Sequence, residues 1–467
     1  MMSEAWAMLN GQILYKDIYH AHPIFQFFIF IPFFILFDNN VVPHVIKFFN
    51  IILIFLGAIL INKLAFKLYK SRLLSFFGAV LFSSYLGYFQ WTQSSYGEFY
   101  ALFPIIAAAL LLYDINYIEK NKILYAGILC GIAFFIKQTS FFDILALIVI
   151  FLISNKYPHK WKLLTILLGG IFISFMVAMI YPLYNSSFYE TIQSIFFHNI
   201  ISYANYSSYN FLEKFPKLFL TFFYQFKYIK HLIFFNDYIF YIFLLTIIFS
   251  IIFIIFGFVQ NKNNKYYQVQ CILCSLIWIV MVLIGIVFIG RFYGHYLVQI
   301  SIPFVFLILS LIYSFPLFLR HFYIIIGTIL ILIFSIVTFY SFIATNVFSP
   351  DAVKKSEEIS QYISNITNNK DTIFLYKESA LDIFYLSKRL SANGIYMFQD
   401  MDSAHTNDKT SENKFRSKLL INKPKIIITG SLATSNGSTF ELFMQKLINA
   451  NYALKTEIRG SKIFLLN

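Results

Sequence analysis

Long apolar runs are the feature of this chain that most constrains its fold. Ten segments are apolar enough to be membrane-spanning helices: 45–62, 73–92, 99–116, 123–136, 140–154, 163–182, 237–258, 268–290, 296–313 and 322–343. A helix needs about 20 apolar residues to cross the hydrocarbon core of a bilayer, and the fourth and fifth runs are shorter than this. The pattern predicts a polytopic α-helical membrane protein with about ten transmembrane helices.

Charge is distributed unevenly along the chain. Only 12% of the residues are charged and 59% are hydrophobic, whereas a typical soluble domain has about a quarter of its residues charged. Residues 1–344 hold 20 Lys/Arg and 10 Asp/Glu, and residues 345–467 hold 16 and 12. Because the charge density more than doubles near Thr345, we predict a membrane domain over 1–344 and a water-exposed domain over 345–467.

The formal net charge of +14 reflects membrane topology, and no nucleic-acid partner is expected. Basic residues concentrate in every second connection between the apolar runs, where there are twelve, against three in the short intervening connections. The twelve are Lys63, Lys67, Lys70, Arg72, Lys120, Lys122, Lys156, Lys160, Lys162, Lys262, Lys265 and Arg320, and the three are Lys47, Lys137 and Arg291. The positive-inside rule then predicts a protein of the cell (inner or plasma) membrane whose C-terminal domain lies outside the cytoplasm, although the 183–236 loop adds four lysines outside.

Two external segments are expected besides the C-terminal domain. Residues 1–44 contain an apolar run at 23–37 that is too short to span comfortably, and we favour an interfacial helix over a transmembrane one. With that choice the N-terminus is external, which suggests a missing first transmembrane helix. The long loop 183–236 is expected to contain a second interfacial helix.

The C-terminal part is predicted to be a small α/β domain. Ser349-Pro350-Asp351 is typical of a helix start and predicts a helix to about Thr367. Further helices are expected at 379–389, 411–421 and 439–450, strands at 371–376, 394–398 and 425–429, and a terminal hairpin at 453–458 and 462–466.

Acidic residues of the membrane part concentrate on the predicted outer side. Ionisable groups at membrane depth are costly, so their presence favours function. Eight of the ten acids in residues 1–344 are predicted to lie outside, together with Lys137, Arg291 and His295. A carboxylate beside cations that suit a phosphate group is what a transferase with a lipid-phosphate donor requires.

Four motifs, in order along the chain, resemble GT-C-type membrane glycosyltransferases, the branch with protein O-mannosyltransferases and lipid A aminoarabinose transferases. They are Gly11-Gln-Ile-Leu-Tyr-Lys-Asp17 followed by His22-Pro23, then Ser95-Tyr-Gly-Glu98, then Gly127-x-x-x-Gly131 leading to Ile136-Lys137-Gln138-Thr139, and Arg291-Phe-Tyr-Gly-His295-Tyr296. The family's Asp, about a dozen residues before the glycine, has no counterpart. Only Glu4 precedes Gly11, seven residues away.

The resemblance implies a GT-C-like fold and transfer, with inversion, of a sugar from a polyprenyl-phosphate donor to an extracytoplasmic glycan, lipid or protein acceptor. It implies Glu98 or Asp17 as the base, Arg291 and Lys137 as phosphate ligands, and His295 and Tyr296 as supporting hydrogen-bonding groups. No cofactor or metal is expected, because Cys130, Cys271 and Cys274 all lie inside apolar runs.

Each of these residues also has a purely structural interpretation. Asp17 and Glu98 are suited to cap a turn or a helix. Lys137 suits snorkelling from a helix end or pairing with Asp143, and Arg291 and His295 suit anchoring at the interface. His20 and His22 beside Asp17 are better explained by a polar loop than by a metal site.

Three other functions remain open at this point. A lipid or polysaccharide transporter or flippase would also place charges near helix ends, but internal repeats and mid-membrane charges are not evident. An envelope polysaccharide polymerase or ligase would use a different donor. A truncated, inactive GT-C-like protein would explain the missing Asp.

The predicted topology has a direct test. We expect a reporter that is active only outside the cytoplasm to give signal when fused after Asn467 or inserted near Tyr96, because basic connections alternate along the chain. Fusions to a reporter active only in the cytoplasm serve as the matched control. Cytoplasmic signal at either site would reject the topology.

Overall fold

The computed structural model describes residues 1–88, 97–113, 119–154, 159–198, 265–289, 294–315, 317–342, 350–378, 380–396, 409–430 and 439–467. The chain divides into two compact units. The first comprises Met1–Ile46, Met179–Ser208 and Thr345–Asn467, and the second comprises Lys47–Ala178 and Tyr209–Ala344.

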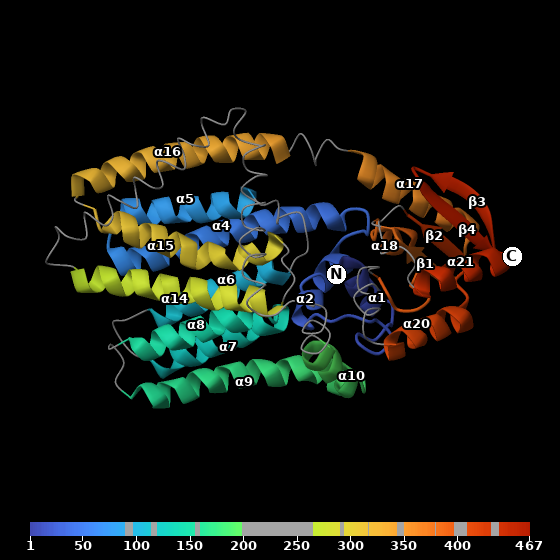
Figure 1. Ribbon diagram of the computed structural model, residues 1–467, viewed down its shortest axis with the longest axis horizontal. Coiled ribbons are helices and arrows are strands. Elements are labelled where there is room, and N and C mark those ends of the chain that lie inside the picture. Colours follow the sequence, from blue (N-terminus) through green and yellow to red (C-terminus); the bar gives the residue numbers. More distant parts are fainter. Residues whose placement is uncertain are drawn as a thin grey trace. The chain divides into compact units, whose positions relative to one another are not determined.

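Most of the second unit, in its described part, is a bundle of long helices (Figure 1). They are α4 (Val42–Tyr69), α5 (Arg72–Tyr88), α6 (Gly97–Leu112), α7 (Lys120–Ile136), α8 (Ser140–Ile153), α9 (Lys160–Tyr184), α14 (Lys265–Ile289), η2 (Gly294–Ile300), α15 (Ser301–Tyr313) and α16 (Leu317–Phe342). Nine of the ten apolar runs are largely helical over their described residues, and the tenth, 237–258, lies outside the described residues.

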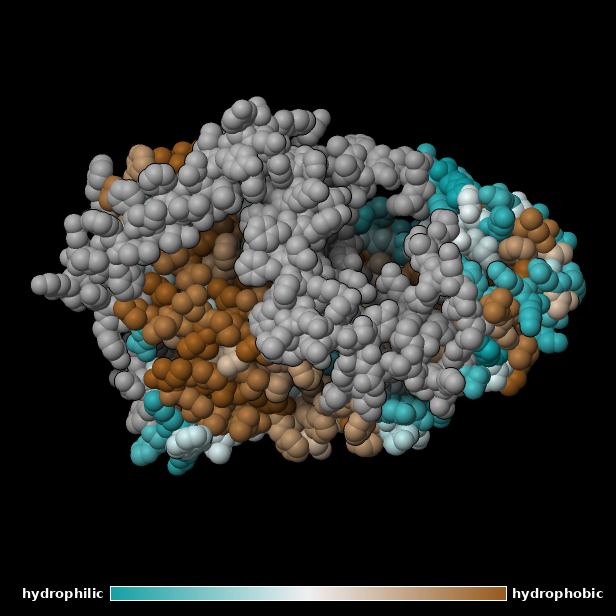
Figure 2. Space-filling view, viewed as in Figure 1, coloured by the Kyte–Doolittle hydropathy of each residue, from teal (hydrophilic) through white to brown (hydrophobic). Residues whose placement is uncertain are grey.

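Four helices of the described part are long and apolar enough to cross a membrane: Val42–Tyr69, Lys160–Tyr184, Val269–Phe288 and Tyr296–Tyr313. Shorter apolar helices occur at Phe25–Leu36, Arg72–Leu86, Gly97–Leu112, Ser140–Ile153 and Leu319–Ile331. On the face that Figure 2 shows, the described surface of the bundle is mostly hydrophobic, whereas that of the C-terminal strands and helices mixes hydrophilic and hydrophobic residues. The total of about ten spans stays a prediction.

Glycines allow helices α7 and α9 to approach each other closely. A Cβ at Gly127 would lie 2.1 Å from the Leu167 carbonyl oxygen, and one at Gly170 would lie 2.3 Å from that of Leu124. The Ser174 hydroxyl donates to the Ile128 carbonyl at 2.8 Å. Apolar helices gain little from hydrophobic burial in lipid, so close backbone packing at small residues is a main source of their association.

Tyrosine hydroxyls connect other helices of the bundle. Tyr69 contacts the hydroxyl of Ser310 at 2.7 Å, and Tyr100 donates to the side-chain oxygen of Asn50 at 2.8 Å. Tyr85 donates to the main-chain carbonyl of Leu297 at 2.9 Å. These bonds satisfy polar groups that would otherwise be costly in an apolar interior.

The C-terminal part of the first unit is built on a four-stranded sheet. Strands β1 (Ile373–Tyr376) and β2 (Ile426–Thr429) are parallel, while β3 (Tyr452–Ile458) and β4 (Ser461–Leu466) form an antiparallel hairpin, in the order β1-β2-β4-β3. The helices of this part are α17 (Pro350–Ile366), α18 (Ile383–Ser387), α20 (Lys409–Asn422) and α21 (Thr439–Asn451). Phe374, Phe415, Leu419 and Phe440 form part of its core.

The α/β elements expected in this part are present with two exceptions. The helix expected at 379–389 covers only Ile383–Ser387. It begins later than expected, and it ends at Ser387 because Lys388 adopts a left-handed conformation with φ of 55°. The prediction of a strand at 394–398 was wrong for its first three residues: Gly394 has a φ of +78° and lies in a bend, and 395–396 are not in a strand. Its remaining residues lie outside the described part, and the domain division at 345 stays a prediction.

The remainder of the first unit consists of short helices and turns. Its helices are α1 (Met2–Leu9), α2 (Phe25–Phe28), α3 (Ile31–Leu36), α10 (Phe188–Ile192) and η1 (Gln193–His198). The apolar run 23–37 therefore forms two short helices, with Ile35 and Leu36 about two-thirds exposed at 66% and 71%. Its expected position in the membrane interface stays a prediction.

The packing of α7 against α9 predicts the effect of a methyl group. We expect Gly127→Ala to lower the free energy of unfolding by about 1–3 kcal/mol, because the new Cβ would overlap the Leu167 carbonyl and force the helices apart. The change is measured by thermal unfolding in detergent. Gly169→Ala is the matched control, since a Cβ there meets nothing within 4 Å. Equal stability of the two variants would contradict this account of the interface.

Candidate functional site

A buried ion pair joins the beginning of α6 to the end of α7. Glu98 lies in the first turn of α6 and is 0% exposed, while Lys137, 4% exposed, is the residue that ends α7. The Lys137 Nζ lies 2.8 Å from Glu98 Oε1. The two helices are consecutive and antiparallel, so the start of one meets the end of the other.

Further buried polar side chains surround this pair. The ring of Tyr296, from η2, has its centroid 6.0 Å from Lys137 Nζ. Gln299 of the same helix donates through Nε2 to the Thr139 hydroxyl at 2.8 Å. We call these five residues, Glu98, Lys137, Thr139, Tyr296 and Gln299, the polar cluster. It lies at the ends of four helices, α6, α7, α8 and η2, which is where the sequence places the outer face.

The structure distinguishes between the interpretations of Lys137. A snorkelling lysine keeps its ammonium group in water, but the Lys137 side chain is only 6% exposed and pairs with Glu98. Asp143 is engaged by another group, since the indole Nε1 of Trp278 donates to its Oδ1 at 2.7 Å. For Glu98, its place in the first turn of α6 also agrees with the capping interpretation, because the helix dipole favours an anion there.

Two of the predicted site residues are not described at side-chain level. Arg291 lies outside the described residues, and His295 is placed in η2 only by its backbone. Their predicted roles as phosphate-binding and supporting groups stay predictions. Tyr296 and Gln299 lie on the same short helix as His295. The predicted motif that ends at Tyr296 therefore reaches the polar cluster.

Asp17 belongs to the first unit and closes a tight turn there. Its Oδ2 accepts the Ile13 N–H at 2.9 Å, and its own N–H donates to the Ile13 carbonyl at 2.8 Å. Tyr15, between them, has a φ of 69°. These bonds favour the turn interpretation of Asp17. The choice between Glu98 and Asp17 as the base stays a prediction.

In the first unit, a buried carboxylate, Glu4, lies close to a buried histidine, His20. His20 Nδ1 accepts the His22 N–H at 3.2 Å, and its Nε2 lies 3.7 Å from Glu4 Oε1. Burial alone raises the pKa of the Glu4 carboxyl, but the Met1 ammonium and His20 outweigh it, so the net pKa is below the usual value. Among the described residues no group of three His, Cys, Asp or Glu side chains is arranged to hold a metal ion.

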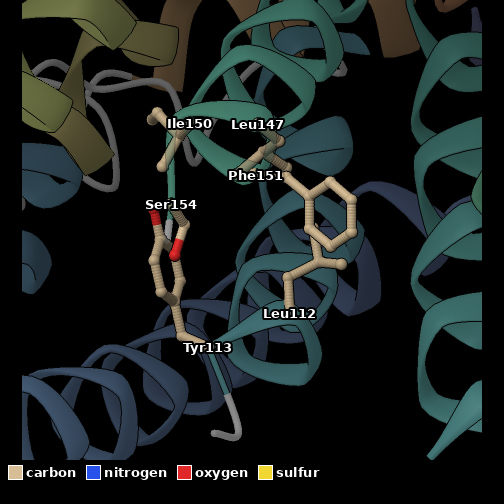
Figure 3. Close-up of a pocket in the computed structure, with 6 residues that line it drawn as sticks. All are labelled: Leu112, Tyr113, Leu147, Ile150, Phe151 and Ser154. Atoms are coloured by element: carbon tan, nitrogen blue, oxygen red, sulfur yellow. The ribbon is translucent and has the colours of Figure 1, made fainter. Parts of the chain in front are cut away.

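One small pocket lies between α6 and α8, as Figure 3 shows. It is lined by Leu112, Tyr113, Leu147, Ile150, Phe151 and Ser154 and has an empty volume of about 220 Å³. Leu112 is fourteen residues after Glu98 on α6, about 20 Å along the helix axis. The pocket is therefore separate from the polar cluster.

The fold of the chain is similar to that of solved structures. Comparison with protein-family models and with curated protein sequences gives no match. A structure of ArnT from Cupriavidus metallidurans bound to undecaprenyl phosphate aligns with a TM-score of 0.56 and 9% identity over 99% of this chain and 92% of ArnT. The apo structure aligns with a TM-score of 0.58 and 9% identity over 99% and 91%. The chain has a GT-C-like fold. The resemblance seen in the sequence motifs is thus confirmed at the level of fold.

The sequence motifs contain Glu98, Lys137, Thr139 and Tyr296, but they do not indicate that Glu98 pairs with Lys137. Gln299, which donates to Thr139, lies three residues after the motif that ends at Tyr296 and was missed. The bond from Trp278 to Asp143 joins residues 135 positions apart, and nothing in the local sequence indicates it.

The ion pair predicts a characteristic pattern of stabilities. We expect Glu98→Gln and Lys137→Met each to lower the free energy of unfolding by about 3–5 kcal/mol, because each leaves the other charge buried without its partner. The double variant removes both charges and should recover most of that loss. Thermal unfolding in detergent measures all three.

Glu119→Gln provides the control for this cycle, since the pair of Glu119 with Lys122, at 3.3 Å, is largely exposed. Its effect should stay below about 1 kcal/mol. Strictly additive losses in the double variant would show that Glu98 and Lys137 do not depend on each other.

Proposed function

We propose that this protein is a multi-pass membrane glycosyltransferase that transfers a sugar from a polyprenyl-phosphate donor to an acceptor outside the cytoplasm. The observation that carries the proposal is the buried pair of Glu98 and Lys137 at the helix ends of a GT-C-like fold. The ArnT structure with undecaprenyl phosphate supports a polyprenyl phosphate as the lipid partner.

The reaction requires a base and a stabilised leaving group. The acceptor oxygen attacks the anomeric carbon from the side opposite the phosphate, the bond from that carbon to the phosphate oxygen breaks, and the electron pair remains on the phosphate. The acceptor's proton passes to a carboxylate. Cations beside the phosphate stabilise the developing charge.

Glu98 suits the role of base because a carboxylate can accept the acceptor's proton, and it lies 2.8 Å from the Lys137 ammonium. In our proposal the anionic donor competes with Glu98 for Lys137. The ammonium shifts towards the phosphate, and the Glu98 carboxylate becomes available to the acceptor hydroxyl. Asp17 remains the second candidate, although its Oδ2 accepts the Ile13 N–H.

The remaining assignments follow the same chemistry. Arg291 offers a planar guanidinium that binds two phosphate oxygens at once, which lysine does not. His295 and Tyr296 supply supporting hydrogen bonds. The transporter or flippase alternative is not favoured, since the GT-C-like fold supports a transferase and the described charged pair of the bundle lies at helix ends.

The proposal predicts that donor binding and transfer respond to different substitutions. Undecaprenyl phosphate should raise the melting temperature of the wild-type protein, Arg291→Ala should abolish most of that rise, and Arg291→Lys should retain part of it. Glu98→Gln should still bind the lipid but lower transfer by about 100-fold or more, because the base is lost. Release of undecaprenyl phosphate from a lipid-linked sugar measures transfer.

Lys162→Ala is the control for loss of a positive charge, because Lys162 is exposed on α9 and predicted to face the cytoplasm. It should leave both readouts unchanged. Wild-type lipid binding by Arg291→Ala would remove Arg291 from the site. Wild-type transfer by Glu98→Gln would remove Glu98 as the base.

A further inference from the structure

The turn that carries Asp17 is bonded to a loop of the C-terminal part within the first unit. The Tyr19 N–H donates to the Gly394 carbonyl at 2.9 Å. The Tyr396 hydroxyl donates to Gln12 Oε1 at 2.6 Å. These two bonds join the turn at each of its ends to a loop that lies more than 370 residues later in the chain.

Gly394 lies directly against the backbone of Asp17. Its φ of +78° is in the left-handed region, and a Cβ at this position would lie 1.7 Å from the Asp17 carbonyl oxygen. No side chain can be accommodated at that distance. Gly394 therefore meets two requirements, one of conformation and one of space, and the second comes from Asp17 itself.

The loop around Gly394 is in turn fixed to the core of the C-terminal part. The Ser391 hydroxyl donates to the Ile395 carbonyl at 2.8 Å, and Asn393 Oδ1 accepts the Ile395 N–H at 3.1 Å. Asn422, at the end of α20, donates to the Ala392 carbonyl at 2.6 Å. The Ala392 N–H donates to the Ile373 carbonyl of β1 at 3.1 Å. The loop is thus hydrogen-bonded both to the sheet and to α20.

Other bonds of the first unit flank the same turn. The Ser3 hydroxyl donates to the Leu381 carbonyl at 2.8 Å, and Asn39 Nδ2 donates to the Tyr385 carbonyl at 2.6 Å. The Tyr19 ring contacts the Phe415 ring edge-on with centroids 5.0 Å apart. The C-terminal part therefore contacts the N-terminal segment of residues 3–39 before, at and after the turn of residues 11–19.

From these contacts we propose that the C-terminal α/β part acts as a brace for the turn of residues 11–19, and that Gly394 and Tyr396 are positioning residues for Asp17. A short surface turn with only its own bonds samples many conformations. Bonds to a sheet-anchored loop select one of them. The part of this inference that concerns transfer rests on the proposed glycosyltransferase function, whereas the brace itself does not.

The test is amide hydrogen exchange of the full-length protein in lipid nanodiscs. In Gly394→Ala the amides of residues 12–20 should exchange on the order of tenfold faster or more, because the Tyr19 bond is lost. Gly460→Ala is the matched control: Gly460 has the same φ of +78°, but a Cβ there meets nothing within 4 Å. Equal exchange in residues 12–20 of the two variants would overturn the brace.

Tyr396→Phe provides a second variant if Gly394→Ala does not fold, which loss of protection in β1 and β2 would reveal. It removes only the hydroxyl that donates to Gln12 and accepts the Ser391 N–H. The same rise in exchange over residues 12–20 is expected, with the sheet still protected. Unchanged exchange in Tyr396→Phe would likewise count against the brace.

Transfer decides whether the brace positions Asp17 for function. We expect both variants to lower the turnover rate by about 10- to 100-fold while undecaprenyl phosphate binds as in the wild type, because a displaced group affects the reaction more than donor affinity. Faster loop exchange with wild-type turnover would overturn the positioning role. If the wild type transfers no sugar, the proposed function fails, and the exchange comparison still decides the brace.

Discussion

The organisation of the described bundle depends on one buried ion pair. Removing two charges from water costs several kcal/mol per ion, and only close contact between them offsets that cost. At 2.8 Å, Glu98 and Lys137 meet this condition. The pair therefore requires that the start of α6 stay against the end of α7, and the close packing of Gly127 and Gly170 holds α7 against α9. The ion pair with Glu98 and the glycine packing against α9 thus both act on α7.

The first unit is held together by a different principle, the need of turns for hydrogen-bond partners. Loops contain backbone groups that have no partner in a helix turn or a neighbouring strand and need one elsewhere. In this unit the Gly394, Leu381 and Tyr385 carbonyls are satisfied by groups from residues 3–39. The N-terminal and C-terminal segments therefore form one compact unit, in which, for these bonds, the first supplies hydrogen-bond donors and the second supplies carbonyl acceptors.

Sequence patterns predict the local elements of this fold well. Apolar runs locate the helices because lipid accepts only segments whose backbone bonds are internal, and Pro350 marks the start of α17 as expected. Predictions fail where long-range contacts decide the conformation. The strand expected from Gly394 onwards is absent at residues 394–396, where Gly394 has a φ of +78° and its carbonyl accepts the Tyr19 N–H.

At the candidate site, too, the sequence predicts the residue types but not the contacts between distant residues. Residue types that suit the chemistry were evident from the motifs, and Glu98, Lys137 and Tyr296 do lie close together. Which of them pair could not be inferred, since the partners of Asp143 and Thr139 come from helices 135 and 160 residues away. Glycine gives the clearest case. Gly394 and Gly460 share a φ of +78°, yet only Gly394 faces a carbonyl at contact distance. The sequence shows the same residue at both positions, but the free energy that a methyl group would cost depends on neighbours that only the folded chain brings together.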